Sequence, residues 1–389
     1  MVDYVSSSGV RRALESADLV VVGAGLFGAT IAEHVARLEN RRVVLLDKRS
    51  HIGGNIFSSD DPQTGIHVHR YGPHIFHTSN DTVARYVSEF SSFNNYVHRV
   101  WSRSQGQTYS LPVNLHTLSQ FFRENLSPGE ARALLPAPTS DASKYSNFEE
   151  AAIGAVGEDL YRAFFRGYTL KQWQEDPRAL PASVFSRLPV RFDFDSRYFS
   201  DHFQGIPVEG YTKLVENMLA SPMISVALDT DFFSVREQIP SGIRVVYTGP
   251  IDAYFENCYG KLKWRTLDFE WERHDVPDYQ GAAQMNYADE NVPWTRIVEY
   301  QHFDPGREAR GSTIISKEFS RSAESPDDEP YYPVRTSEDI AAYSKYRRLS
   351  SREQNVYFGG RLGSYAYFDM DMTIASAISL FRKYFQSNR

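Results

Sequence analysis

Three glycines near the N-terminus have the spacing of a loop that can hold a phosphate group. They are Gly23, Gly25 and Gly28, in the run Gly23-Ala24-Gly25-Leu26-Phe27-Gly28. The first glycine of such a loop makes a tight turn, the second lets the backbone approach a pyrophosphate, and the third lets a helix pack on a strand. The N–H groups at the start of the following helix then attract the negative charge.

Residues downstream complete the pattern of a dinucleotide site. Asp47 stands 19 residues after Gly28, where a carboxylate can accept a hydrogen bond from a ribose hydroxyl. Gly53-Gly54-Asn55 follows, and its flexible backbone can pass close to a diphosphate, although a plain turn is the alternative. We expect the dinucleotide to contact Gly23, Gly25, Leu26, Phe27, Gly28, Asp47, Lys48, Gly54 and Asn55.

Arginines and tyrosines later in the chain are side chains that a second diphosphate would need. Arg187 and Arg191 flank a proline loop, and Arg296 lies in a run that predicts a strand. Two guanidiniums can each make paired hydrogen bonds to a diphosphate, whereas a single one is often only a solvated or paired charge. Phenol groups that can bind phosphate oxygens stand at Tyr331, Tyr332 and Tyr367.

Histidines and aromatic residues are the remaining candidates. His74 lies in the glycine–proline segment Arg70–Thr78, where it can reach a bound ring or remain an ordinary core or surface histidine. No cysteine or carboxylate stands near it at metal-ligand spacing, so no zinc site is expected. Tyr168 and Trp173 end an aromatic helical stripe, which is either core or a stacking platform for a nucleobase or sugar.

The elements that must position these residues can be read from their hydrophobic patterns. Apolar runs predict buried strands at 18–22, 43–46, 243–249 and 356–358, and helical patterns at 29–38 and from 372 onward. Helices are predicted at 115–122 and 148–165, a proline-broken loop at 177–189, and antiparallel strands between about 260 and 320. Residues 1–17 read as a short lead-in.

This arrangement predicts an α/β fold in three parts. The first is a discontinuous Rossmann-like domain that binds FAD, formed by residues 1–85, 207–258 and 345–389. An inserted helical domain spans 86–180, and an antiparallel sheet domain for the substrate spans 181–206 and 259–344. A closing strand and helix from the C-terminus are typical of flavoproteins that wrap their FAD, and less so of simple NAD dehydrogenases.

Composition excludes several functional classes. A net charge of −7 disfavours binding to nucleic acid or anionic membranes. Cys258 is the one cysteine, so the chain has no internal disulfide and no cysteine metal cluster, which favours a reducing cytosol. No apolar run reaches the roughly 18 residues of a membrane span, and the N-terminus lacks a signal-peptide core. We expect a cytoplasmic protein without membrane insertion.

Longer strings point to one family. In order, the chain contains GPHIFHT, GYTLKQW, SRLPVRF, NVPWTRI, PYYPV and GRLGSYAYFDMDMTIA. From about residue 18 to the C-terminus it resembles the bacterial UDP-galactopyranose mutases. The resemblance implies an FAD domain, a helical domain and a sheet domain, usually in a homodimer. It also implies interconversion of UDP-galactopyranose and UDP-galactofuranose, with FAD reduced by NAD(P)H or a chemical reductant and no net redox change.

The family's mechanism would give each candidate residue a role. Flavin N5 attacks the anomeric carbon and displaces UDP, which must stay bound nearby. By resemblance, Arg187 is the mobile-loop arginine and Arg296 the fixed one, and Arg187 is preferred to Arg191 for its spacing from Trp173. His74 would lie near flavin and sugar. Substrate contacts would come from Tyr168, Trp173, Tyr198, Arg191, Tyr331, Tyr332, Tyr367 and His98, and further cofactor contacts from His74, Arg361, Asp369 and Met370.

Two positions depart from the family pattern and leave the sugar open. Many relatives resemble an asparagine type at His98, and Arg70 is often apolar. Both lie near the expected sugar pocket, so UDP-N-acetylgalactosamine or a deoxysugar nucleotide is an alternative substrate. A flavin amine oxidase on the same fold is a second alternative, and a regulatory protein that keeps FAD only for stability is a third.

Overall fold

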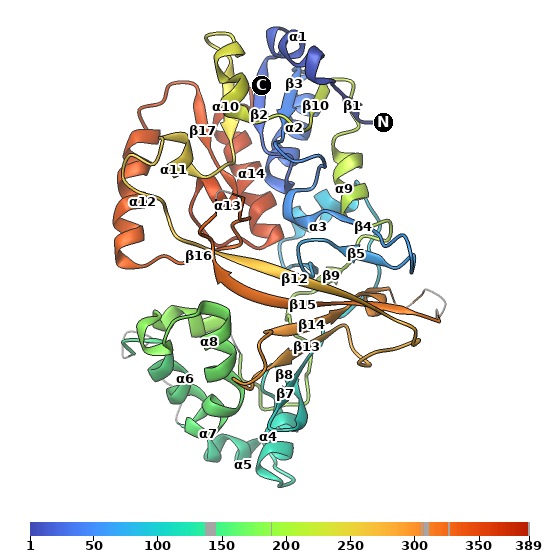
Figure 1. Ribbon diagram of the computed structural model, residues 1–389, viewed down its shortest axis with the longest axis vertical. Helices are drawn as coiled ribbons and strands as arrows, with labels where there is room; N and C mark the ends of the chain where they lie inside the picture. The colour runs from blue at the N-terminus through green and yellow to red at the C-terminus, as the bar shows by residue number, and fades with distance from the viewer. Residues whose placement is uncertain (137–144, 188, 305, 307–310, 326, 388–389) are drawn as a thin grey trace.

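The computed structural model describes residues 1–136, 145–187, 189–304, 306, 311–325 and 327–387, except for the side chains of Ser183, Ser186 and Arg187. Figure 1 shows three layers along the long axis of the molecule. A parallel sheet with its helices lies at one end, a second sheet with long strands crosses the middle, and a group of helices forms the other end. The predicted α/β class, with a Rossmann-like domain, is confirmed.

The parallel sheet forms the first layer. Its strand order is β1 (Asp3–Tyr4), β10 (Ile224–Ala227), β3 (Val43–Leu46), β2 (Leu19–Val22), β11 (Arg244–Tyr247) and β17 (Val356–Phe358). The central strands are continuous apolar runs because helices cover both faces. On one face, α2 (Leu26–Glu39) packs against α14 (Met370–Tyr384), while α1 (Val10–Glu15) and α10 (Phe232–Val235) share a core cluster on the other.

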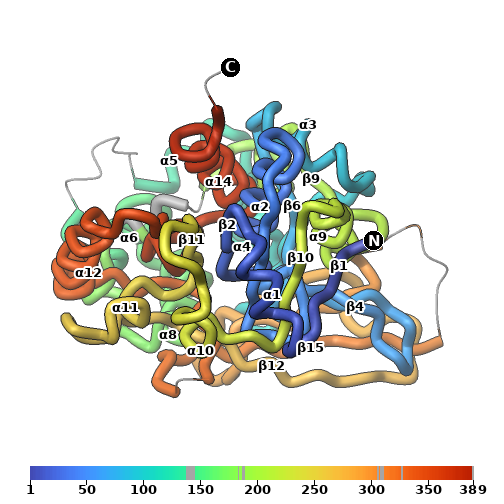
Figure 2. The backbone as a smooth tube through the Cα atoms, turned by 90° about the horizontal axis from the view of Figure 1, so that it is seen from above, coloured from blue at the N-terminus to red at the C-terminus, as the bar shows by residue number. Residues whose placement is uncertain are grey.

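The N-terminal segment is more ordered than the sequence pattern indicated. Residues 1–17 provide strand β1, which pairs with β10, and helix α1, which buries Val10 and Leu14. Viewed from above, β1 lies at one edge of the parallel sheet, and α11 (Ile251–Tyr254) and α12 (Ser337–Ser350) lie beyond the other (Figure 2). The predicted domain boundary at 345 falls inside α12, which packs against α11 and β17.

A second sheet crosses the middle of the molecule. Its order is β16 (Tyr332–Pro333), β12 (Trp264–His274), β15 (Thr313–Ser322), β14 (Arg296–Glu299), β13 (Gln284–Tyr287), β7 (Val100–Ser104) and β8 (Gln107–Leu111). All neighbouring pairs are antiparallel except β13 and β7. Strands β7 and β8 were expected in the helical domain, so the boundary at 86 is wrong: the sheet extends through residue 111.

The helical layer differs from prediction in one helix. Helix α4 (Leu115–Phe122) has the predicted bounds. The helix expected over 148–165 is divided, because Gly157 adopts φ +81° between α6 (Phe148–Val156) and α7 (Glu158–Leu160). A π-helical turn over 161–166 then leads into α8 (Gly167–Trp173). These helices and α5 (Pro128–Leu134) share one apolar core.

Smaller elements join the layers. The described residues of 181–206 do not enter the seven-stranded sheet: β9 (Phe203–Gly205) pairs instead with β6 (Phe76–Thr78). The others are β4 (Ser58–Asp60), β5 (His67–His69), α3 (Asp81–Ser88), α9 (Tyr211–Met218), α13 (Gly360–Gly363), and short 3-10 turns over 7–9, 54–56, 177–179, 182–187, 236–238 and 300–303. Among the described helices, none combines the length and apolar character needed to cross a bilayer.

Candidate active site

A cavity of roughly 630 Å³ lies between the two sheets. It begins at the carboxyl ends of the central parallel strands, where Val22, Leu46 and Tyr247 line it. This is the usual place for a ligand in an open α/β sheet. It continues to β14 and β16 of the second sheet, which contribute Arg296 and Tyr332. One cavity therefore joins the glycine loop to the candidate diphosphate clamp.

The glycine loop has the geometry that its spacing predicts. Gly23 adopts φ +105°, and a Cβ at Gly28 would lie 1.9 Å from the Gly23 carbonyl oxygen. A Cβ at Gly25 would meet only the Gly54 Cα, at 3.9 Å, so this backbone faces open space. No side chain of the described residues caps the N-terminus of α2, which leaves its N–H groups for an anion.

The second glycine segment closes over the first. Gly54 has φ +55°, and a Cβ there would lie 3.1 Å from the Gly25 Cα. The Nδ2 group of Asn55 is buried without a partner among the described residues. Since a buried donor without an acceptor is costly, a bound ligand is expected to accept from it. The bare helix terminus, the two glycine backbones and this donor together fit the diphosphate of a dinucleotide.

Asp47 links the first glycine segment to the backbone that follows β3. Its Oδ2 accepts from the Ala24 N–H at 2.7 Å, and its Oδ1 accepts from the Arg49 N–H at 2.9 Å. The carboxylate lines the cavity beside Lys48 and so keeps lone pairs for a ribose hydroxyl, a contact that stays a prediction.

Arg49 was missed by the sequence reading. It forms an ion pair with Glu329, donates to Asn55 Oδ1 at 2.8 Å, and places its guanidinium 4.6 Å from the Tyr71 ring. Glu329 stands two residues before Tyr331, so this ion pair links the segment Gly53–Asn55 to the segment that contains Tyr331 and Tyr332. The partners are 280 positions apart, and no local pattern signals the contact.

Arg296 is the cation at the far end of the cavity. Strand register places it opposite Glu318, and its Nε donates to Glu318 Oε2 at 2.7 Å. The buried carboxylate raises the pKa of Arg296, which therefore stays charged. Among the described residues its two Nη groups have no hydrogen-bond partner, and Arg296 lines the cavity, so these donors are available to an anion.

Tyrosines and a second arginine flank this cation. Tyr332 and Tyr367 stack with ring centroids 5.8 Å apart, and both line the cavity with Tyr331 and Tyr198. Burial raises the pKa of Tyr331, which remains a proton donor. Arg361 donates to the Pro330 carbonyl at 3.1 Å. Every predicted cofactor residue lines the same cavity: Gly23, Gly25, Leu26, Phe27, Gly28, Asp47, Lys48, Gly54, Asn55, His74, Arg361, Asp369 and Met370.

Three histidines line the cavity near Arg296. His74 Nδ1 lies 2.8 Å from the Gly72 carbonyl oxygen, His77 Nδ1 lies 2.7 Å from Asp201 Oδ2, and His98 Nδ1 lies 3.1 Å from the Tyr96 hydroxyl. Burial, with the charge of Arg296 as a smaller contribution, lowers the pKa of His74 to about 4 and that of His98 to about 3. Both are therefore neutral near pH 7.

These two pKa values predict an acid-sensitive fold. A folded-state pKa below the unfolded value means that the unfolded chain binds the proton first, so stability falls as pH drops from about 6.5 toward 4. Between pH 7 and pH 5 each of His74 and His98 should cost about 2 kcal/mol of unfolding free energy. Urea unfolding at the two pH values measures this loss. His98→Asn should show a smaller loss, and an unchanged pH dependence in that variant would contradict the assignment for His98.

Among the predicted substrate residues whose side chains the structure describes, three do not line the cavity: Tyr168, Trp173 and Arg191. Tyr168 is half-buried and close enough to Arg296 to interact electrostatically. Trp173 packs against the core of the helical layer. The side chain of Arg187 lies outside the described residues, and its backbone ends the turn over 182–187.

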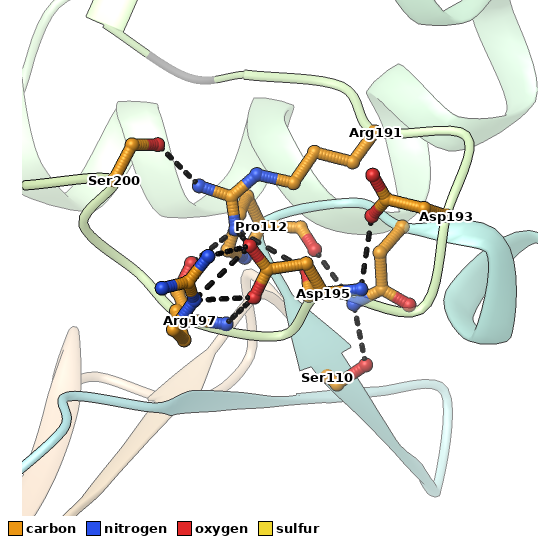
Figure 3. A network of polar contacts seen from close by, with 8 residues as sticks. Ser110, Pro112, Arg191, Asp193, Asp195, Arg197 and Ser200 are labelled. Carbon is orange, nitrogen blue, oxygen red and sulfur yellow. Dashed lines mark hydrogen bonds and ion pairs between the residues drawn. The ribbon is translucent and has the colours of Figure 1, made fainter.

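Arg191 has a structural role instead of the predicted substrate contact. Its guanidinium donates to the carbonyls of Asp195 and Arg197 and to Ser200 Oγ, so it organises the 195–200 loop (Figure 3). That loop carries Tyr198, whose N–H donates to the His98 carbonyl at 2.8 Å. The guanidinium donors of Arg191 are therefore used within the protein, which leaves few of them for a diphosphate.

Lys171 fixes α8 to the second sheet. Its Nζ donates to the carbonyls of Tyr287, Asp289 and Trp294 at 2.6, 2.9 and 3.1 Å. We expect Lys171→Met to lower the unfolding free energy by about 3 kcal/mol, because three carbonyls lose their donor in a partly buried site. Urea unfolding measures this, with Lys261→Met at an exposed position as the control; equal stability of the two variants would refute the role.

Comparison with known proteins agrees with this geometry. A family model described as UDP-galactopyranose mutase matches residues 163–367, and one described as NAD(P)-binding Rossmann-like domain matches 21–90. A probable UDP-galactopyranose mutase of Klebsiella pneumoniae is 45% identical, over 94% of both chains. The chain belongs to the UDP-galactopyranose mutase family. A dTDP-fucopyranose mutase of Escherichia coli is 44% identical over 95% of this chain and 99% of its own.

Solved structures show the same fold. A reduced UDP-galactopyranose mutase matches with TM-score 0.68 and 16% identity over 94% of this chain and 93% of its own. A putative protoporphyrinogen oxidase from Exiguobacterium matches with TM-score 0.60 and 13% identity, covering 94% and 98%. At such identities the likeness concerns the fold alone. Membership of the mutase family, together with the fit of the glycine segments to a dinucleotide, indicates a flavin cofactor.

Proposed function

We propose that this chain is an FAD-dependent isomerase that interconverts UDP-galactopyranose and UDP-galactofuranose with no net redox change. The observation that carries the proposal is the single cavity in which a dinucleotide cradle meets the available guanidinium of Arg296. An oxidase has no need of a cation that holds a leaving diphosphate. The names of the relatives at 45% and 32% identity support the same activity.

In this proposal some residues bind UDP and others position the sugar. When bound in its reduced form, FAD supplies the nucleophile that takes the place of UDP at the anomeric carbon. Arg296 and Arg187 neutralise the diphosphate as the C–O bond breaks and keep UDP in place for the return step. Phosphate oxygens accept from the phenols of Tyr331, Tyr332 and Tyr367.

The sugar and nucleoside need contacts beyond those to the phosphates. We assign Tyr198, which lines the cavity, and Tyr168 and Trp173, which lie outside its lining, to the uridine and adjoining sugar, and His74 to the sugar beside the flavin. The Gly72 carbonyl can only accept, so His74 carries its proton on Nδ1 and leaves Nε2 as an acceptor for a sugar hydroxyl. Gly25, Gly54 and Asn55 would hold the FAD diphosphate, and Arg361, Asp369 and Met370 would contact the rest of the cofactor.

Cellular aspects of the proposal follow from the family. We expect a cytoplasmic homodimer whose flavin is reduced by NAD(P)H. Its furanose product would serve the synthesis of cell-surface polysaccharide. The formal net charge of −7 disfavours a nucleic acid as the partner, and an anionic nucleotide sugar must be bound by local cations such as Arg296.

A second substrate has specific support. The Escherichia coli dTDP-fucopyranose mutase is nearly as similar as the Klebsiella relative, at 44% against 45% identity. A deoxysugar nucleotide is therefore the main competitor, ahead of UDP-N-acetylgalactosamine. A flavin amine oxidase is less well supported: putrescine oxidase shares the fold at TM-score 0.54 and 12% identity.

Product analysis tests these alternatives directly. The FAD-loaded protein, reduced with dithionite, is incubated with UDP-galactofuranose or dTDP-fucofuranose, and products are separated by anion-exchange chromatography. We expect UDP-galactopyranose from the first and slower conversion of the second. Faster conversion of the fucose nucleotide would reverse the substrate assignment. Stoichiometric reduction of oxidised flavin by an amine, without sugar conversion, would support the oxidase.

A further inference from the structure

The three histidines at the substrate end of the cavity differ in the partner that holds each ring. His74 Nδ1 faces a carbonyl, and His77 Nδ1 faces the carboxylate of Asp201. Each of these partners can only accept when the carboxylate is ionised, so both histidines must donate from Nδ1. In their neutral forms they turn an Nε2 acceptor to the cavity.

His98 faces a hydroxyl, which can donate or accept. The Tyr96 hydroxyl lies 3.1 Å from His98 Nδ1, and both side chains are buried, at 8% and 3% exposure. Among the described residues the phenol has no other hydrogen-bond acceptor. If His98 donated from Nδ1, the phenol proton would be buried without a partner, which costs about 1 to 3 kcal/mol. Tyr96 therefore donates to Nδ1.

The proton of neutral His98 then resides on Nε2. No described residue bonds this nitrogen, and His98 lines the cavity close to Arg296 and His77. Its ring is held in place, because it lies 5.5 Å from the edge-on Tyr198 ring and 5.7 Å from the Phe199 ring, centroid to centroid. A fixed neutral donor thus projects into the part of the cavity assigned to the sugar.

We propose that His98, held by Tyr96 as the Nε2–H tautomer, is a specificity-determining donor to one hydroxyl oxygen of the substrate sugar. This inference rests on the proposed function. A buried donor discriminates strongly, because an analogue without the oxygen leaves the N–H unpaired. A deoxysugar that lacks this oxygen is rejected, whereas a sugar that retains an acceptor there is bound.

The tautomer itself can be measured without turnover. Nitrogen-15 NMR of the oxidised, FAD-loaded protein labelled at histidine is recorded, and the His98 signals are assigned by their loss in His98→Asn. We expect a protonated Nε2 and a bare Nδ1, and a changed pattern in Tyr96→Phe, which cannot donate. A proton on Nδ1 in the unmodified protein would overturn the inference.

The selectivity is tested by binding. Dissociation constants are measured by calorimetry for UDP-galactopyranose and for its 2-, 3- and 6-deoxy and matching fluoro analogues, since fluorine can accept but not donate. At one position the deoxy analogue should bind about 100-fold more weakly, and the fluoro analogue clearly better than the deoxy. If the deoxy and fluoro analogues lost the same affinity at every position, His98 would act as an acceptor, and the proposal would be overturned.

Two variants separate a hydrogen bond from a packing role. His98→Asn retains an N–H donor and should still bind the deoxy analogue much more weakly than UDP-galactopyranose. In His98→Leu this difference in affinity, the deoxy penalty, should disappear. A penalty that persists in His98→Leu assigns the contact to another residue. Normal UDP-galactopyranose binding without conversion would defeat the proposed function, while the analogue series would still decide the role of His98.

Discussion

Replacement of Arg296 by alanine will lower kcat/KM for UDP-galactofuranose by about 10³-fold while the protein still binds flavin. The loss follows from removing the available Nη donors that hold the diphosphate as its bond to the sugar breaks. Steady-state kinetics of the dithionite-reduced enzyme measure the change, and absorbance of bound flavin measures cofactor content. The kcat/KM of Arg296→Lys, which keeps the charge but not the paired donors, should lie between the values of the unmodified enzyme and of Arg296→Ala.

The same substitution has a structural cost that must be separated from the kinetic one. Glu318 is 1% exposed, so alanine at position 296 leaves its carboxylate buried without its partner. We expect this to cost about 3 to 5 kcal/mol of unfolding free energy. In Arg296→Ala/Glu318→Gln, stability should recover but activity should not. Recovery of activity together with stability would show that Arg296 acts only on the fold.

Gly28→Ala is expected to weaken flavin binding by about 100-fold or more. Its Cβ would lie 1.9 Å from the Gly23 oxygen and 3.1 Å from Val21 Cγ1, so α2 must move away from β2. That shift displaces the N–H groups that face the cofactor diphosphate. Titration of the apoprotein with FAD, followed by flavin fluorescence, gives the dissociation constant.

A matched glycine provides the control for this prediction. Gly129 lies in helix α5, and a Cβ there would meet no atom of the described residues within 4 Å. Gly129→Ala should therefore leave flavin binding unchanged and add up to about 1 kcal/mol of stability. Similar flavin affinities for the Gly28 and Gly129 variants would mean that the glycine loop does not position the cofactor.

The part of the site that the sequence predicted best is the part built from neighbouring residues. Strand β2, the glycine turn and helix α2 are contiguous, so their order in the sequence is also their order in space. Asn55 and Asp369 line the cavity as expected. Asn55 was predicted from the second glycine pair, which follows Asp47 closely, and Asp369 from the string GRLGSYAYFDMDMTIA, which carries the family resemblance.

Contacts between distant segments could not be predicted in the same way. Glu318 faces Arg296 only because of the register between β14 and β15, and Arg49 reaches Glu329 across 280 positions. Strands β7 and β8 join the second sheet through parallel pairing with β13, far along the chain. Gly157, in contrast, was a local signal: a glycine inside a helical pattern can mark a break.

Arg191 shows the limit of residue type as evidence. Two arginines four positions apart are equally suited to a diphosphate by chemistry. The structure commits the guanidinium of Arg191 to backbone carbonyls of its own loop. Family spacing favours Arg187, whose side chain lies outside the described residues, so its part in the clamp stays a prediction.

The central claim is that the bond between the sugar and UDP breaks and re-forms without net oxidation. Positional isotope exchange tests it most directly. UDP-galactopyranose labelled with ¹⁸O at the bridging anomeric oxygen is incubated with the dithionite-reduced, FAD-loaded enzyme, and the label is followed by ³¹P NMR. We predict that label moves into the non-bridging β-phosphate oxygens of recovered substrate. Label that stays bridging while furanose forms would contradict the account.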